Sequence, residues 1–235
     1  MSLNVSRIIQ KQLTDSQYFR TANEKNIIVV HHTAGNANPF NVIDGWQKSR
    51  TRVATAFLIS GKPRKETDGF KDGDIVQAFS SKYYAYHLGL KTNKNVPITK
   101  SSIGIEICNW GWLTKKEDGK YYTYVNSVVP EEEVIELEEK FKGYKYWHKY
   151  SDAQLLSLRD LLIYLCDKYD ISKKYQGDEI FDLNERALNG DSGIWTHVSY
   201  REDKFDCPPQ PSLKRILSTL EAPSGISQKV PVSTL

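Results

Sequence analysis

The chain has 235 residues, of which 39% are hydrophobic and 26% are charged. This length and composition are typical of a globular protein that buries a core without disulfide staples. The net charge of +3 is too small to indicate nucleic-acid binding. No apolar run approaches the roughly 20 residues that a membrane-spanning helix needs.

The cysteines and the N-terminus also limit the class of protein. An odd, low number of cysteines does not indicate a disulfide framework. Cys108 falls in an apolar strand pattern and Cys166 in an apolar helix pattern, so both are expected to be buried as small hydrophobic residues. The first residues, Met1–Arg7, contain no apolar stretch followed by a small-residue cleavage site, so the chain carries no visible export signal.

Secondary structure in the first half is predicted to alternate between strands and helices. Residues 1–25 are polar, with a short helix expected at Ser6–Leu13. Asn26–His32 contains four consecutive β-branched residues, which indicates a strand buried on both faces. A helix is predicted at Asn41–Ser49. Further strands are predicted at Val53–Ser60, Ile75–Phe79 and Ile103–Cys108.

The second half contains an insertion and the clearest helix. Residues 109–150 are rich in Tyr, Trp and Lys, and Asp118-Gly119 within them predicts a hairpin turn. Ser151 is a good N-cap with Gln154 at the capping-box position, and leucines then recur at helical spacing. A last helix is expected at about 212–220, followed by a tail or linker, 222–235. Together these elements predict an α/β fold, a mixed central β-sheet flanked by helices.

Three residues have the chemistry of zinc ligands. Catalytic zinc is commonly held by three His, Cys or carboxylate side chains, with a fourth position left open. His31 ends the buried strand, and because strand side chains alternate, His31 and His32 point to opposite faces. His197 and Cys207 lie ten residues apart, and the prolines after Cys207 restrict its loop. A single histidine or cysteine is more often structural than a metal ligand. The prediction of a zinc site therefore rests on the combination of the three residues.

The order of several motifs resembles that of the type 2 amidase family, which comprises N-acetylmuramoyl-L-alanine amidases and peptidoglycan recognition proteins. The similarity extends over about residues 26–220. The segments that carry it are Ile28–Gly35, Ala54–Ile59, Tyr86–Gly89, Ser102–Glu106, and His197 with Cys207-Pro208. The resemblance implies one amidase-like domain, 26–221, with an N-terminal extension, 1–25, and the insertion 109–150.

The resemblance also implies the residues of the site. His31, His197 and Cys207 would bind Zn²⁺. In the family the third ligand is Cys or Asp, and Cys207 is preferred over the adjacent Asp206 because it directly precedes the proline. Glu106 would be the general base, since amide hydrolysis requires removal of a proton from water and its return to the departing amine. The alternative is that Glu106 is a solvent-facing strand residue between two core isoleucines.

The sequence departs from the family pattern in two places. Some members have a Tyr on the second strand, where this chain has Thr55 or Ala56. Some have a Lys two residues before the last ligand, where this chain has Phe205, with Lys204 one step further away. Lys204 and His87 are therefore candidates for catalytic helpers or substrate contacts. The alternatives are a solvated loop charge for Lys204 and a structural, hydrogen-bonding role for His87.

The aromatic residues of the insertion have two interpretations. They could form a glycan-binding wall beside the cleft, because aromatic rings offer flat apolar faces with polar edges. They could instead form a small satellite core that pins a hairpin through cross-strand pairs. The sequence favours the second interpretation.

The predicted function is zinc-dependent cleavage of the bond between N-acetylmuramic acid and L-alanine in peptidoglycan. The competing prediction is a non-catalytic peptidoglycan-binding module, but such relatives commonly lack a zinc ligand, and here all three candidates and Glu106 are present. Peptidoglycan is the expected partner, with no nucleic acid, and the chain is expected to be a monomer. Without a visible export signal, a phage endolysin or a cytoplasmic enzyme of cell-wall recycling fits best. The alternative is a secreted enzyme whose signal has been removed.

Overall fold

The computed structural model describes residues 3–221 and contains two β-sheets. The main sheet has six strands in the order β1-β4-β3-β5-β2-β11. Strands β3, β5, β2 and β11 are mutually parallel, and β4 runs antiparallel to β3. Its strands are β1 (Ile9–Gln10), β2 (Ile27–His32), β3 (Phe57–Ile59), β4 (Ile75–Gln77), β5 (Ser102–Ile107) and β11 (Gly193–Thr196). The sheet is therefore mixed, as predicted.

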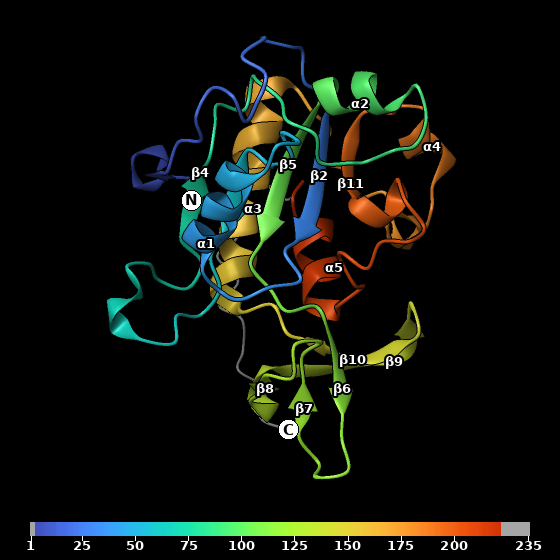
Figure 1. Ribbon diagram of the computed structural model, residues 1–235. Helices are drawn as coiled ribbons and strands as arrows, with labels where there is room; N and C mark the ends of the chain where they lie inside the picture. The colour runs from blue at the N-terminus through green and yellow to red at the C-terminus, as the bar shows by residue number, and fades with distance from the viewer. Residues whose placement is uncertain (1–2, 222–235) are drawn as a thin grey trace.

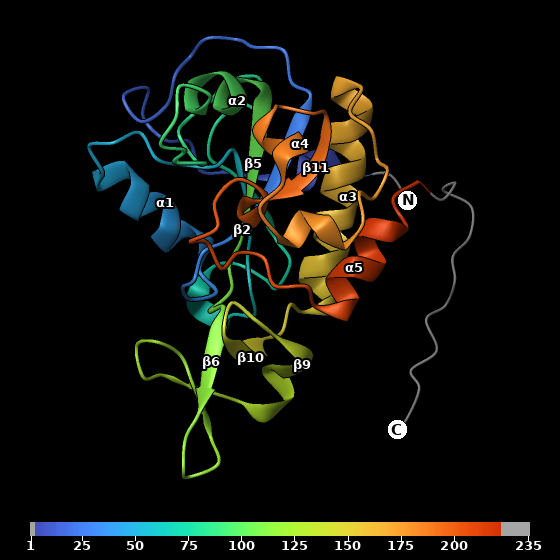
Figure 2. The same ribbon diagram turned by 90° about the vertical axis from the view of Figure 1, so that its right-hand side faces the viewer.

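Helices cover both faces of the main sheet. Figures 1 and 2 show α1 (Pro39–Lys48) on one face, and α3 (Asp152–Tyr169) with α5 (Pro211–Ser218) on the other. Helix α3 begins with the predicted capping box, in which Ser151 and Gln154 exchange hydrogen bonds, and its leucine stripe is buried. Because both faces are covered, β2 is buried along its whole length. The short helices α2 (Asn95–Ser101) and α4 (Glu185–Leu188) lie at the end of the sheet where β5 begins (Figure 1).

The predicted insertion folds into the second sheet, which lies below the main one in Figures 1 and 2. Its antiparallel strands are ordered β8-β7-β6-β10-β9. They are β6 (Trp112–Lys115), β7 (Tyr121–Tyr122), β8 (Val128–Val129), β9 (Val134–Phe141) and β10 (Tyr144–His148). The predicted turn at Asp118-Gly119 joins β6 to β7, and Gly119 adopts a φ of 79° that favours glycine. We call this sheet the small sheet.

Several sequence expectations differ from the structure. The helix expected at Ser6–Leu13 is wrong: Val5–Arg7 forms one 3-10 turn, and β1 then pairs with β4, so sheet pairing overrides a weak local helical pattern. The strand expected at Val53–Ser60 is regular only at Phe57–Ile59. The expected tail, 222–235, lies outside the described residues, and the predicted domain boundaries stay predictions.

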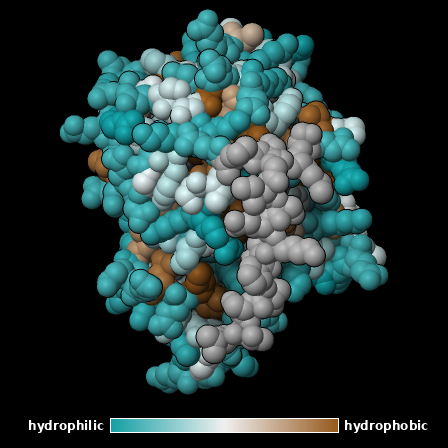
Figure 3. All heavy atoms as spheres, turned by 180° about the vertical axis from the view of Figure 1, so that it is seen from behind, coloured by the Kyte–Doolittle hydropathy of each residue, from teal (hydrophilic) through white to brown (hydrophobic). Residues whose placement is uncertain are grey.

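The surface is largely hydrophilic on the side opposite to that of Figure 1 (Figure 3). Among the described residues, no helix combines the length and the apolar character needed to cross a bilayer.

Candidate metal centre and catalytic cavity

Four polar side chains meet where the parallel strands of the main sheet end. His31 lies near the end of β2, and Glu106 is its direct partner on β5. His197 immediately follows β11, whose last residue Thr196 pairs with Val30. The carboxyl ends of parallel strands are where open α/β sheets place their ligands. The sheet register thus brings together residues that are up to 166 positions apart, from 31 to 197.

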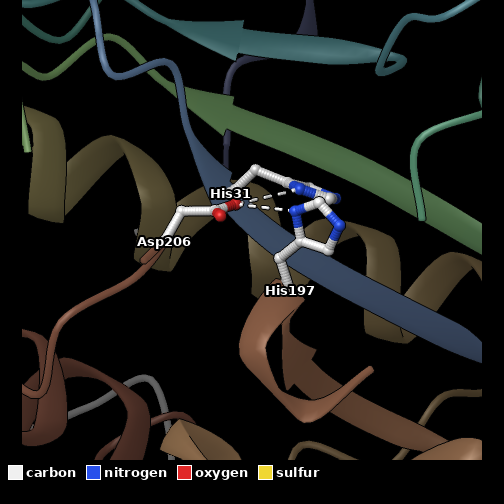
Figure 4. A group of neighbouring side chains, drawn as sticks. All are labelled: His31, His197 and Asp206. Atoms are coloured by element: carbon white, nitrogen blue, oxygen red, sulfur yellow. Dashed lines mark hydrogen bonds and ion pairs between the residues drawn. The ribbon is translucent and has the colours of Figure 1, made fainter. Parts of the chain in front are cut away.

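Asp206 completes this group from the loop after β11. Its Oδ2 lies 3.2 Å from His31 Nδ1 and 3.0 Å from His197 Nδ1. Figure 4 shows both imidazole rings pointing toward the Asp206 carboxylate. The potential ligand atoms of the three buried residues all lie within 4.8 Å of one another. Two imidazole nitrogens and one carboxylate oxygen at this spacing suit a zinc ion.

Hydrogen bonds behind the two histidines hold their rings in place. His31 Nε2 lies 3.0 Å from His87 Nδ1, and His197 Nε2 lies 2.9 Å from the Leu88 carbonyl oxygen. The carbonyl can only accept, so His197 donates its Nε2 proton to it, and Nδ1 is the nitrogen that would bind a cation at the centre. The distant nitrogen of a metal-binding histidine is commonly fixed by such a partner.

The charge state of these residues suits a cation. Burial, reinforced by the nearby His197, lowers the pKa of His31 to about 4, so His31 is neutral at pH 7. Burial alone would raise the pKa of Asp206, but His197 and His31 hold it below its usual range, so the carboxylate is ionised. Neutral imidazole and ionised carboxylate are the forms that bind metal ions.

Cys207, the third ligand preferred from the sequence, does not lie in this group. It is fully buried, and its thiol interacts with the Tyr150 hydroxyl. Burial raises the pKa of the Cys207 thiol well above its usual range, whereas zinc binds the thiolate. The preference based on the adjacent proline therefore does not match the geometry, which brings Asp206 to the two histidines instead.

His32 lies on the opposite face of β2 from His31, as the alternation of strand side chains predicts. Its Nδ1 lies 2.9 Å from the Tyr150 hydroxyl oxygen. Tyr150 is fully buried and thus joins His32 and Cys207 in one polar cluster behind the strand.

Glu106 and Lys204 face the centre. Both line a cavity of about 540 Å³ together with His31, His197 and Asp206, a size typical of ligand sites. Burial, and then the charge of Asp206, raise the pKa of Glu106 well above its usual range, while the charge of Lys204 acts in the opposite direction. Its neighbours Ile105 and Ile107 are buried. Burial of these two residues fits either role of Glu106, but Glu106 itself is only partly exposed, so it is not a fully solvated strand residue.

His87 contacts the centre from behind. Its Nδ1 faces His31, and its Nε2 lies 2.8 Å from the Ser102 hydroxyl oxygen. Thr55, at the position where some family members have Tyr, hydrogen-bonds to the Phe57 carbonyl oxygen instead. The sequence contained one signal for Asp206 that the proline argument outweighed: Lys204 stands two residues before it, the spacing expected between a Lys and the last ligand.

The mixed sheet and the polar cavity at its carboxyl edge are the arrangement in which α/β enzymes bind their ligands. Residues 21–210 match the family described as N-acetylmuramoyl-L-alanine amidase, and the chain belongs to this family of enzymes. The comparison with curated proteins found no match.

Several solved structures have a similar fold. The structure of PlyL is 14% identical with a TM-score of 0.51, and the alignment covers 91% of this chain and 96% of that one. A mutant endolysin from Bacillus subtilis is 16% identical, with a TM-score of 0.50 and coverage of 92% and 99%. Staphylococcus aureus hydrolase AmiA in complex with its ligand is 12% identical, with a TM-score of 0.50 and coverage of 93% and 84%. Because these sequence identities are low, the similarity shows a shared fold and nothing further.

Proposed function

We propose that this amidase hydrolyses the amide bond between N-acetylmuramic acid and L-alanine with a zinc ion held by His31, His197 and Asp206. The observation that carries the proposal is the buried group of two imidazole Nδ1 atoms and one carboxylate oxygen beside Glu106. When bound there, zinc would supply Lewis-acid chemistry, which polarises an amide carbonyl and makes water more acidic.

Glu106 is the general base in this proposal. Its position on β5, directly beside His31, places a carboxylate at the edge of the site. A carboxyl group of raised pKa suits proton transfer in both directions near neutral pH. Glu106 takes a proton from the attacking water and delivers it to the alanine nitrogen as the amide bond breaks.

Lys204 stabilises negative charge that develops on the carbonyl oxygen. With Asp206 as the third ligand, Lys204 stands two residues before the last ligand. This is the position at which some family members have a Lys, so in this respect the chain matches the family pattern. An ammonium group in a partly enclosed cavity favours the negatively charged transition state over the neutral amide.

His87 is a positioning residue rather than a catalytic one. If His31 binds through Nδ1, its Nε2 proton is donated to His87 Nδ1. His87 then donates its own Nε2 proton to the Ser102 hydroxyl, which donates to the Thr99 carbonyl. Every donor in this series has an acceptor, so the series selects the tautomer of His31 that presents a lone pair to zinc.

The test is digestion of bacterial sacculi, with and without a zinc chelator, followed by mass spectrometry. We expect stem peptides with new L-alanine amino termini, absent after chelation and for His197→Ala. Cys166→Ala, at a buried position outside the cavity, is the matched control and should remain active. Retention of sacculi without new termini would instead indicate a recognition module.

A further inference from the structure

Three aromatic side chains form a continuous row between the small sheet and the loop that carries Asp206. Trp112 of β6 stacks on Tyr144 of β10, with ring centroids 4.3 Å apart and ring planes 16° apart. Tyr144 in turn contacts Phe205 edge to face at 5.9 Å. Phe205 directly precedes Asp206. We call Trp112, Tyr144 and Phe205 the aromatic row.

The aromatic row borders the cavity that contains the metal centre. Trp112 and Phe205 line this cavity together with Glu106, and Phe205 is 37% exposed. Tyr124, which is 52% exposed, lies 6.2 Å from Trp112 and extends the aromatic surface outward. A partly exposed aromatic surface thus begins at the cavity and continues along the small sheet.

Packing within the small sheet accounts for the Trp112–Tyr144 pair, which joins two neighbouring strands, but not for Phe205. The sheet has its own small core of Leu113, Tyr121 and Val129, with Tyr146 packed against it. Leu113 is the neighbour of Trp112 on β6, so this core lies on the other face of the sheet. Phe205 belongs to a loop outside the small sheet, so cross-strand pairing does not explain its place in the row.

The inner part of the same sheet face serves the main core. Trp147 pairs with Trp112 in the sheet register and therefore points to the same face, but it is fully buried. Trp112 and Tyr144, at the other end of this face, also pack against the main core but stay partly exposed. The partly exposed end is the part available to a ligand.

We propose that the aromatic row is a sugar-binding subsite for an N-acetylhexosamine ring of the glycan strand, adjacent to the muramoyl unit whose amide is cut. The inference rests on the proposed function. A pyranose ring has an apolar C–H face that packs on a flat aromatic ring, while its hydroxyl groups remain in water. The row itself contains no charged side chain. Acetylated sugars are uncharged, whereas stem peptides carry carboxylates and amines, so the glycan is the part of the polymer that fits the row.

The test measures sugar binding without an amide to cut. The full-length protein is titrated with a β-1,4-linked tetramer of N-acetylglucosamine, and binding is followed by calorimetry and tryptophan fluorescence. We expect saturable binding that weakens at least fivefold in Trp112→Ala and in Phe205→Ala. The second variant removes an exposed loop side chain, which makes it informative even where Trp112→Ala disturbs the small sheet.

Tyr122→Ala is the matched control. Tyr122 belongs to the small sheet but bonds to Asp118 and does not line the cavity. We expect its sugar affinity to equal that of the wild type. Absence of saturable binding, or equal affinity in the wild type and the folded row variants, would overturn the proposal. Displacement of the sugar by a free stem peptide would also overturn it, because it would assign the row to the peptide.

A second measurement separates this subsite from the amidase activity. We expect Phe205→Ala to raise KM at least fivefold for long glycan chains with stem peptides, relative to its effect on a muramoyl peptide without flanking sugars. An equal change for both substrates would contradict a glycan subsite. Loss of sugar binding leaves the amidase assignment intact, and an inactive protein that still binds the tetramer leaves the subsite intact.

Discussion

His31 Nε2 lies 3.0 Å from His87 Nδ1, and this contact lies on the opposite side of the His31 ring from Asp206. The two sides of one imidazole therefore have different partners, since one nitrogen faces the candidate metal centre and the other is held by a second histidine. The orientation of the His31 ring therefore depends on His87.

Replacement of His87 should weaken zinc binding. Loss of such a supporting hydrogen bond typically costs 10- to 100-fold in metal affinity. We expect a reduction of this size in His87→Ala, measured by competition with a chromogenic chelator. His87→Asn should recover part of the affinity, because its amide oxygen can accept the His31 proton near the position of Nδ1. Equal zinc affinities for the wild type and His87→Ala would show that His87 does not support His31 as a ligand.

The third ligand can be identified by metal content. Asp206→Asn removes the charged oxygen that lies within 3.2 Å of both histidines, so we expect it to be purified with little or no zinc. Cys207→Ser retains a hydroxyl that can still bond to Tyr150, and we expect close to one zinc per chain. Elemental analysis of both proteins decides the matter. The reverse result would restore Cys207 as the ligand.

Glu106→Gln should abolish most activity while zinc remains bound. The amide keeps the shape of the side chain but cannot accept a proton from water. General acid–base catalysis typically contributes 10²- to 10⁴-fold, so kcat should fall by about that factor. Zinc content and the unfolding midpoint, measured on the same preparation, should match those of the wild type. A fall of less than about threefold in kcat would exclude Glu106 as the base.

Lys25 should make stability depend on pH. It is buried beneath the sheet end, where its ammonium donates to the Lys100 and Ser102 carbonyl oxygens. Burial lowers the pKa of Lys25 from 10.5 to about 7. Between these values the unfolded chain binds more protons than the folded one, so the free energy of unfolding rises with pH across this window.

The size of this effect can be isolated by a difference measurement. One titrating group changes the unfolding free energy by at most about 1.4 kcal/mol per pH unit. Urea unfolding at pH 7 and pH 9.5 should therefore show a larger increase for the wild type than for Lys25→Met. Lys91→Met, at an exposed position, controls for the loss of one charge. Identical increases in all three proteins would show that Lys25 remains charged when folded.

Much of the fold could be predicted from local patterns. The capping box at Ser151 and the turn at Asp118-Gly119 depend on residues close in sequence, and both are found where expected. The helix expected at Ser6–Leu13 is wrong because the conformation of this segment depends on pairing with β4, which begins more than 60 residues later. Partners at that distance leave no local signal.

The candidate site was likewise predictable where it depends on neighbouring residues, and not where it depends on contacts between distant segments. The opposite orientations of His31 and His32 follow from strand geometry, and the structure confirms them. The choice between Asp206 and Cys207 depends on how one loop approaches two strands, and a neighbouring proline does not determine that approach. The contact of His87 with His31 also joins distant segments, so the sequence left its role open.

The paired histidines have a consequence for how the chain finds its correct strand alignment. From Ile27 to Val30 both faces of β2 are apolar and buried, so these residues tolerate a shift by one position without exposing a polar group. His31 and His32 remove this tolerance, because each has a specific polar partner. A shift by one residue moves one histidine into the place of the other and puts Val30 or Thr33 into the vacated place. Either Asp206 or Tyr150 then loses its imidazole partner. Buried polar groups without partners cost about 1–3 kcal/mol each. His31, which faces the candidate metal centre, and His32, behind the strand, thus together favour one alignment of β2 over its neighbours.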